Sequence, residues 1–155
     1  MRLTKYKTRL TADGKAVLEK EVSVNTQAVD KVMNSPEKLN RLARYLRLHE
    51  ETEEYLYMVC LNTKLHLTSV FEISHGNVNS SVAGVREIFQ KALLANAVSI
   101  IMMHNHPSGD CTPSREDIEV TKKLIEAGRI MGIDVLDHIV VGRDSYSSLR
   151  DKGYI

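Results

Sequence analysis

The sequence predicts an α/β fold in which a mixed β-sheet lies between layers of helices and a β-hairpin comes first. From residue 54 onward, apolar runs of strand length alternate with segments whose apolar residues recur at helical spacing. Before residue 35, two alternating polar and apolar segments flank an Asp-Gly pair, which is typical of a hairpin turn. We therefore expect an N-terminal β-hairpin extension over residues 1–34 and an α/β domain over residues 35–155.

The first two elements follow from local patterns. Residues 3–10 and 16–24 predict the hairpin strands, and Asp13-Gly14 between them indicates a two-residue turn. Ser35, followed by a proline and a glutamate, indicates the start of a helix. Leucines and an alanine then recur at helical spacing, so this helix should pack one face on the sheet and end near His49.

Strands and helices alternate through the rest of the chain. The expected strands are residues 55–61, 65–73, 98–103 and 133–141. Apolar residues at helical spacing predict one helix from Val85 and another from Ser114. The loop 75–81, rich in Gly, Asn and Ser, is either a plain connection or part of a substrate cleft.

The composition is that of an ordinary globular protein. The 155 residues are 43% hydrophobic and 26% charged. The two cysteines, Cys60 and Cys111, match no disulfide framework and no cysteine-rich zinc pattern. Neither a signal peptide nor a membrane-spanning run is recognisable, so we expect a cytoplasmic protein that does not contact the membrane.

The charge pattern bears on possible partners. Residues 1–50 carry 11 Lys and Arg against 6 Asp and Glu, whereas residues 51–155 carry 10 against 14. This gradient falls short of the clustered basic surface typical of nucleic-acid-binding proteins. We therefore expect nucleic-acid binding to be weak or absent. The sequence does not indicate an oligomeric state.

Most of the residues that could bind a metal ion or take part in catalysis lie in one loop. His104 and His106 stand two apart at the end of the apolar run 98–103, so both imidazoles can point to the same side of an extended chain. Proline and glycine residues then turn the chain, and Ser114 opens a helix whose first turn carries Asp117. Two histidines and a returning carboxylate can supply the three protein ligands of a catalytic zinc ion.

Simpler interpretations exist for each of these residues. Ser114 and Asp117 together are typical of a helix cap, in which the serine accepts a hydrogen bond from a backbone N–H. A single histidine near a strand end is more often structural than a metal ligand. Because two histidines, a turn and a carboxylate occur in one loop, we favour the metal site, and the capping interpretation of Ser114 is compatible with it.

The pattern His-x-His-Pro followed by Ser-x-x-Asp resembles the signature of the JAB/MPN metallopeptidase superfamily. Residues 104–142 are similar to its bacterial RadC branch, whose members carry the label of DNA repair proteins, and the resemblance covers about residues 35–153. It implies a three-layer JAB/MPN-like domain over residues 35–155, in a short form without the helix-hairpin-helix segment of longer members. Cys111 stands where that branch more often has proline, and its thiol is either reactive or an inert small side chain.

The resemblance also implies a site. It assigns one Zn²⁺ per chain to His104, His106 and Asp117. It places the catalytic glutamate before the strand 55–61, where Glu54 is the matching residue, Glu53 its nearest rival and Glu87 a weaker one. Ser114 would donate a hydrogen bond to the developing oxyanion. His138 is taken as structural, with support of a metal ligand as the alternative.

These expectations define a function. The chain should be a zinc-dependent hydrolase that cleaves a peptide or isopeptide bond in an unidentified peptide or protein, with Glu54 moving the proton from water to the leaving amine. Phosphodiester cleavage commonly uses two metal ions, and a zinc deaminase uses cysteine ligands, so neither fits this residue set. The alternative is a non-catalytic scaffold, or a binding module associated with DNA repair, on the same fold.

Overall fold

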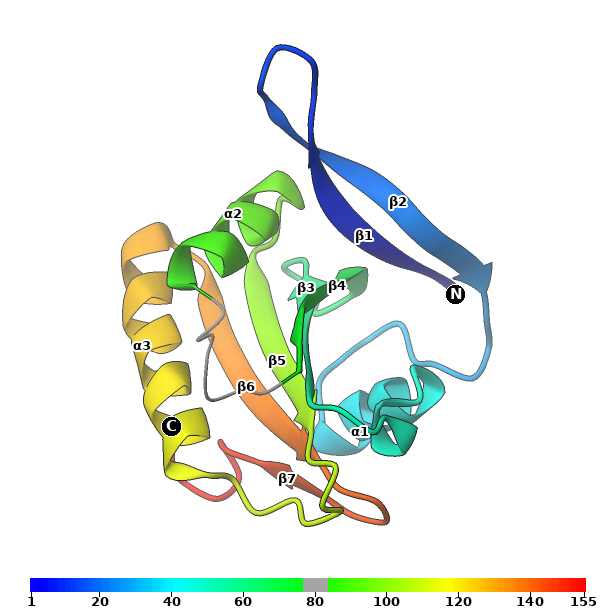
Figure 1. The fold of residues 1–155 in the computed structure, drawn as a ribbon, viewed down its shortest axis with the longest axis vertical. Helices are drawn as coiled ribbons and strands as arrows, with labels where there is room; N and C mark the ends of the chain where they lie inside the picture. Colours follow the sequence, from blue (N-terminus) through cyan, green and yellow to red (C-terminus); the bar gives the residue numbers. More distant parts are fainter. Residues whose placement is uncertain (77–83) are drawn as a thin grey trace.

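The computed structural model describes residues 1–76 and 84–155, and these residues form a seven-stranded mixed β-sheet with helices on both faces (Figure 1). The strands are β1 (Arg2–Leu10), β2 (Ala16–Asn25), β3 (Tyr55–Leu61), β4 (Leu67–His75), β5 (Ser99–Asn105), β6 (Asp134–Val141) and β7 (Tyr146–Ser148). The helices are α1 (Pro36–Tyr45), the 3₁₀ helix η1 (Leu48–Glu50), α2 (Val85–Leu94) and α3 (Arg115–Met131). The predicted α/β class with an N-terminal hairpin is confirmed. No helix in the described parts of the chain is long and apolar enough to cross a membrane.

The strand order places β5 inside the sheet. Across the sheet the order is β2-β1-β4-β3-β5-β6-β7. β5 runs antiparallel to β3 and parallel to β6, and α3 provides the crossover that parallel neighbours need. All seven residues of β5 are buried, which fits the unbroken apolar run at residues 100–103.

Two hydrophobic cores lie on opposite faces of the sheet. Val59 and Ile101 pack with α1 on one face, whereas Met58 and Met102 pack with α2 and α3 on the other. Because side chains alternate along a strand, His104 follows Met102 onto the face that carries α3. This alternation directs His104 toward the helix that begins just after Ser114.

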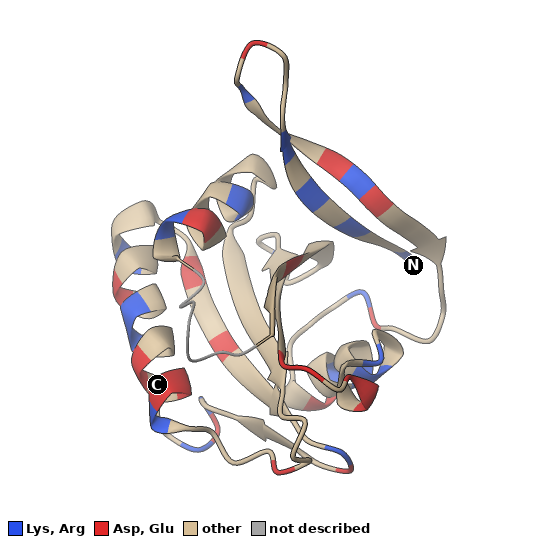
Figure 2. Cartoon of the chain, in the orientation of Figure 1, with Lys and Arg blue, Asp and Glu red and all other residues tan. Residues whose placement is uncertain are grey.

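The N-terminal hairpin extends the sheet beyond β4. Lys5 and Tyr6 of β1 pair with Val70 and Phe71 in parallel. Figure 2 shows basic residues of β1 opposite acidic residues of β2 along this hairpin. The turn is longer than the predicted two residues, because the Thr11 N–H donates to the Lys15 carbonyl and Gly14 has a positive φ of 79°. Glycine adopts that conformation without a steric penalty.

Some elements differ from the prediction. α1 ends at Tyr45 rather than near His49, because Arg47 has a left-handed φ of 62° that separates α1 from η1. β4 begins at Leu67 rather than at residue 65, since Leu65 lies in the preceding turn with a φ of 55°. β7 was not predicted, because a strand of three residues carries too little pattern to recognise.

Candidate metal centre

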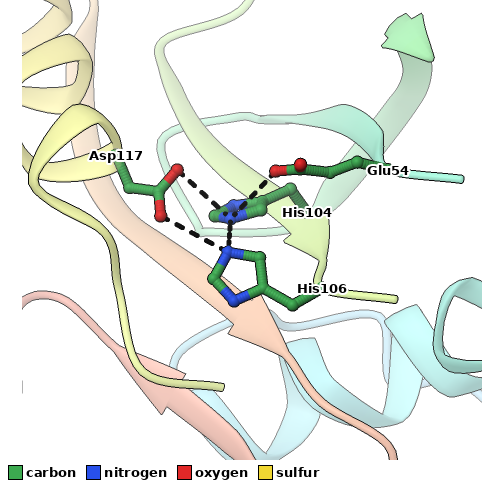
Figure 3. Close-up of side chains that lie close together, drawn as sticks. All are labelled: Glu54, His104, His106 and Asp117. Carbon is green, nitrogen blue, oxygen red and sulfur yellow. Dashed lines mark hydrogen bonds and ion pairs between the residues drawn. The ribbon is translucent and has the colours of Figure 1, made fainter. Parts of the chain in front are cut away.

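Four side chains from three parts of the chain meet at the carboxyl end of β5 (Figure 3). His104 and His106 come from the end of β5 and the loop after it, Asp117 from the first turn of α3, and Glu54 from the residue before β3. Each offers one nitrogen or oxygen atom, and these four atoms all lie within 4.8 Å of one another. The structure therefore brings together the three predicted ligands and the predicted catalytic glutamate.

Distances place the His104 ring at the middle of the group. Its Nε2 atom lies 3.0 Å from Nε2 of His106, 3.3 Å from Oδ1 of Asp117 and 3.7 Å from Oε1 of Glu54. The side chains of His104 and Asp117 are 3% and 6% exposed, whereas those of His106 and Glu54 are 18% and 21% exposed. The inner wall of the site is therefore buried and its outer side faces solvent.

Neighbouring strands and a close backbone contact hold the histidine loop. His104 is paired with Leu56 of β3 and with Val140 of β6. The His106 N–H donates to the Val141 carbonyl at 3.0 Å, which carries the β6 contact one residue beyond the strand. A Cβ atom on Gly142 would come within 2.4 Å of the carbonyl oxygen of Gly109, so glycine lets the turn after β6 support the loop.

A capping box orients Asp117. The Ser114 hydroxyl accepts from the Asp117 N–H at 3.1 Å, and Oδ2 of Asp117 accepts from the Ser114 N–H at 2.7 Å. The predicted helix cap is confirmed, and it leaves Oδ1 of Asp117 facing His104. Since the hydroxyl of Ser114 accepts in this contact, its own hydrogen can still be donated to another group. The oxyanion role of Ser114 stays a prediction.

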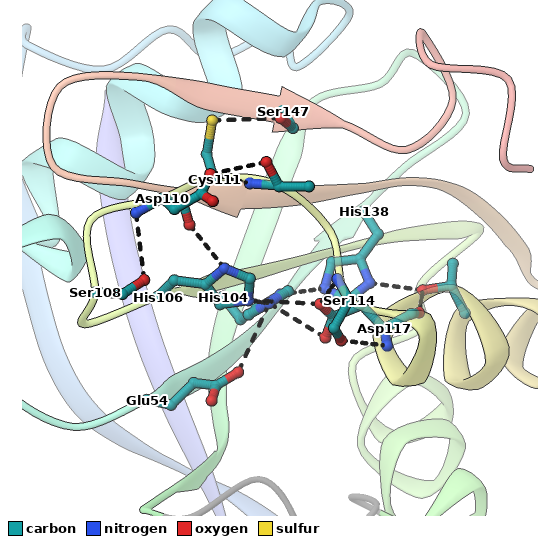
Figure 4. Close-up of polar contacts among 12 residues, drawn as sticks. Glu54, His104, His106, Ser108, Asp110, Cys111, Ser114, Asp117, His138 and Ser147 are labelled. Carbon is teal, nitrogen blue, oxygen red and sulfur yellow. Dashed lines mark hydrogen bonds and ion pairs between the residues drawn. The ribbon is translucent and has the colours of Figure 1, made fainter.

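A hydrogen-bonded chain assigns the tautomer of His104 (Figure 4). The Thr121 hydroxyl donates to the Asp117 carbonyl at 2.6 Å, so it accepts from Nδ1 of His138 at 2.6 Å. Nε2 of His138 is then an acceptor, and Nδ1 of His104, 2.8 Å away, donates to it. Nε2 of His104 consequently carries no hydrogen and presents its lone pair to the site.

A hydrogen bond also fixes the tautomer of His106. Its Nδ1 lies 2.8 Å from the carbonyl oxygen of Asp110, which can only accept, so Nδ1 carries the hydrogen. In the neutral rings, the lone pairs of two Nε2 atoms therefore face each other at 3.0 Å without a hydrogen between them. Two such lone pairs beside a carboxylate need a shared cation. The nitrogen and oxygen donors present fit a divalent metal ion such as zinc.

The two carboxyl groups differ in proton affinity. Burial raises the pKa of Glu54, and the nearby imidazoles offset this only in part. Burial also opposes ionisation of Asp117, but Nε2 of a protonated His104 or His106 donates to the carboxylate, and these contacts hold the pKa of that carboxyl far below its usual range. Because the protonated ring of His106 gains this hydrogen bond to Asp117, the pKa of His106 is raised. Asp117 is therefore suited to bind a cation and Glu54 to accept a proton.

The remaining candidates lie elsewhere. Glu53 is exposed, and the carboxylate of Glu87, also exposed, folds back over Gly84 at the start of α2. Neither belongs to the four-residue group among the described residues. Of the loop 75–81, residues 77–81 fall outside the described residues, so its place in a cleft stays a prediction.

The sequence favours a structural role for His138, and the structure adds a contact between its ring and the His104 ring within a buried network. Burial lowers the pKa of His138 well below its ordinary value, which keeps the ring neutral and able to accept from His104. The signal that could have identified it is a histidine directly before the apolar run of Ile139 and two valines.

Cys111 lies in the loop between β5 and α3, where its side chain contacts β7 and the turn before it. Its Sγ is 3.2 Å from the Ser145 hydroxyl and accepts from the Ser147 hydroxyl at 3.4 Å. Burial opposes ionisation of the thiol, but these hydroxyls outweigh it and lower the pKa of Cys111. In contrast, burial raises the pKa of Cys60 to about 12. Whether Cys111 reacts selectively stays a prediction.

A polar cleft of about 640 Å³ opens beside His106. Its walls come from the end of α1, the segment before β3, the histidine loop and the turn between β6 and β7. Arg44 and Arg143 lie in these walls, and Arg44 donates to the Arg143 carbonyl at 3.1 Å. The cleft therefore meets the four-residue group at His106, on its solvent-facing side.

Comparisons with known proteins agree with this geometry. A family model described as the RadC-like JAB domain matches residues 33–154. A UPF0758 protein from Methanosarcina barkeri is 46% identical over 111 residues, which are 72% of this chain and 48% of that protein. One from Desulforamulus reducens is 52% identical over 108 residues, 70% of this chain and 48% of that protein. One from Desulfitobacterium hafniense is 42% identical over 99% of this chain and 69% of its own length. The chain thus spans about half the length of several relatives.

Proposed function

Because this chain belongs to the RadC-like JAB domain family, we propose that it is a zinc-dependent hydrolase that cleaves a peptide or isopeptide bond. One observation carries the proposal: two imidazole lone pairs and the carboxylate of Asp117 converge on one position, and Glu54 lies at its open side. In the proposal, His104, His106 and Asp117 hold the metal ion. Three protein ligands with an open position are typical of catalytic zinc sites, whereas structural zinc has four.

Each residue then has a defined task in hydrolysis. A metal ion in this site supplies Lewis acidity, which activates water as a nucleophile and polarises the substrate carbonyl. Glu54 accepts a proton from the attacking water and returns it to the leaving amine, and its raised pKa suits both transfers. Ser114 donates its free hydroxyl hydrogen to the oxygen that gains negative charge. His138 keeps His104 in the tautomer that leaves Nε2 free.

The residue set favours an amide bond over a phosphodiester. Enzymes that cleave phosphodiesters commonly use two metal ions about 4 Å apart. Among the described residues, one cluster of potential ligands is found, and it contains two carboxylates, one of which is needed for proton transfer. Acidic residues also lie among the basic ones on the helices and on β2 (Figure 2), which supports weak rather than specific binding of DNA.

The test is the change Glu54→Gln, assayed with zinc-loaded protein on a degenerate peptide library and on single- and double-stranded DNA. We expect bound zinc to be retained and peptide hydrolysis to fall by about 10²–10⁴, the usual contribution of a general base. The matched control is Glu53→Gln, one residue away and exposed, which should leave the rate unchanged.

Three outcomes would contradict the proposal. Equal peptide hydrolysis by the wild type and the Glu54→Gln variant would remove Glu54 from the mechanism. No hydrolysis by either protein, despite bound zinc, would favour the scaffold or binding module. DNA cleavage that depends on Glu54, without any peptide cleavage, would overturn the assigned bond class.

A further inference from the structure

A side chain bridges β3 and β5 where their backbone pairing stops. The ladder between the two strands ends at the pair Leu56 and His104. One residue further, Asn105 uses its side-chain amide: Oδ1 accepts from the Tyr55 N–H at 2.8 Å, and Nδ2 donates to the Glu53 carbonyl at 2.9 Å. The two bonds span the peptide units on either side of Glu54.

These two hydrogen bonds are shielded from solvent, so the groups that form them have few other partners. Asn105 is 1% exposed, so an unpaired amide here, or an unpaired backbone group facing it, would cost about 1–3 kcal/mol. The backbone of Asn105 itself pairs with Val141 of β6, which fixes the position of the side chain. From the other side, the Gly76 N–H donates to the Glu54 carbonyl at 3.0 Å. The backbone around Glu54 is thus held by β5 and by the end of β4.

This arrangement determines which acid faces the metal position. Successive side chains of an extended segment point in opposite directions. With Tyr55 and Glu53 both bonded to Asn105, Glu54 points toward His104, where its Oε1 lies 3.7 Å from Nε2, and Glu53 remains exposed. The amide of Asn105 lies on the face of β5 opposite to the His104 ring, so it does not touch the reacting groups.

We propose that Asn105, the middle residue of the His-x-His motif, is the positioning residue for Glu54. Asn105 links the two histidines to the glutamate. It lies on the strand that presents the histidines, and its side chain fixes the backbone on either side of Glu54. The inference rests on the proposed function, since it takes Glu54 to be the general base.

The test is a double-mutant cycle with Asn105→Ala and Glu54→Gln. We expect Asn105→Ala to keep about one zinc per chain and an unchanged KM, and to lower kcat by about 10²-fold, as a displacement of about 1 Å can. In the Glu54→Gln background the same change should have no further effect. The control Ile101→Val lies on the same strand and in the core beneath α1, and should leave kcat unchanged.

A second readout does not depend on activity. In the metal-loaded protein, Asn105→Ala should increase hydrogen exchange at the Tyr55 amide, which loses its acceptor, and leave the Val59 amide in the middle of β3 protected. Asn105→Asp keeps the size and the acceptor but loses the donor to the Glu53 carbonyl. We expect it to protect Tyr55 and still lower kcat, and it replaces the alanine variant if that protein does not fold.

The outcomes separate the two proposals. If Glu54→Gln lowers the rate but neither variant of Asn105 does, the positioning role is wrong and the proposed function stands. An equal loss of rate from Asn105→Ala in both backgrounds would also overturn it, since the effect would not pass through Glu54. If Glu54→Gln has no effect, the proposed function fails, and the positioning role fails with it whatever the Tyr55 exchange shows.

Discussion

His138 decides which nitrogen of His104 faces the metal position. Thr121 fixes the hydrogen of His138 on Nδ1, so Nε2 of His138 accepts from Nδ1 of His104 at 2.8 Å. Metal-binding histidines commonly donate their second nitrogen to a buried acceptor in this way, and such acceptors tune affinity. Here a neutral imidazole takes the place that a carboxylate or a carbonyl more often occupies.

Removing this acceptor should weaken metal binding. We expect His138→Ala to lower zinc affinity by about 10–100-fold, since Nδ1 of His104 would lose its partner and the ring its orientation. His138→Gln offers an oxygen acceptor and should lose less. Competition with a chromophoric chelator measures the dissociation constants, with His66→Ala, outside the group, as the control. Equal affinities for the wild type and His138→Ala would contradict this role.

At the residue scale, prediction succeeded where the pattern was local. His104, His106 and Asp117 lie within fourteen residues, so strand alternation and a helix start were enough to associate them. Glu54 lies 50 residues away from His104 and required the family resemblance. The contacts of Asn105 and His138 come from the sheet register, which pairs β5 with β3 and β6, and no local pattern specifies that register.

At the element scale, α3 begins with a capping box and contains a glycine that its packing requires. Gly128 lies on the buried side of α3, where helix propensity alone would favour alanine by about 1 kcal/mol. A Cβ atom at this position would come within 2.4 Å of the carbonyl oxygen of Ile133, which is backbone and cannot move aside cheaply. Close packing, rather than propensity, therefore selects this residue.

We expect Gly128→Ala to destabilise the protein by about 1–3 kcal/mol despite the gain in helix propensity, which is the usual range for overpacking. Unfolding in urea measures the change, and the exposed Lys122→Ala on the same helix should stay within about 0.5 kcal/mol of the wild type. A Gly128→Ala protein more stable than the wild type would show that the contact relaxes without cost.

The elements themselves were largely predictable because most have a clear period. The predicted bounds of β3 and the predicted start of α2 agree with the structure. β3 is a distinct apolar run, and the apolar residues of α2 recur at a clear helical spacing. The end of α1 was not, because it depends on Arg47 adopting a left-handed conformation that arginine seldom prefers. β7 forms only because Val141 and the two residues before it offer an open edge for pairing.

At the scale of the whole molecule, one half-buried cation ties the N-terminal hairpin to the rest of the sheet. β1 pairs with β4 at only two positions, Lys5 with Val70 and Tyr6 with Phe71. Lys5 adds an ion pair to Glu72 at 2.8 Å and lies 5.3 Å from the centre of the Tyr57 ring. Burial opposes both charges, yet the hydrogen bond between them raises the pKa of Lys5 and lowers that of Glu72.

These shifts predict a pH-dependent contribution to stability. The pKa of Glu72 is lower in the folded protein than in the unfolded chain, where it is about 4.3. Its contribution to the free energy of unfolding is therefore complete above the unfolded pKa and is lost as the pH falls through the folded pKa. Lys5 remains charged throughout that range. We expect Lys5→Met to destabilise the protein by about 1 kcal/mol near pH 7 and by progressively less toward pH 3. Urea unfolding with a chelator present tests this, and a difference independent of pH would contradict it.

In the proposed function, His104, His106 and Asp117 hold one catalytic metal ion. Elemental analysis of protein purified without chelator tests this assignment most directly. We predict about one zinc per chain for the wild type and for Glu54→Gln, and almost none when the three ligands are changed together to alanine in a protein that still folds. Full zinc retention by that triple variant would contradict the account.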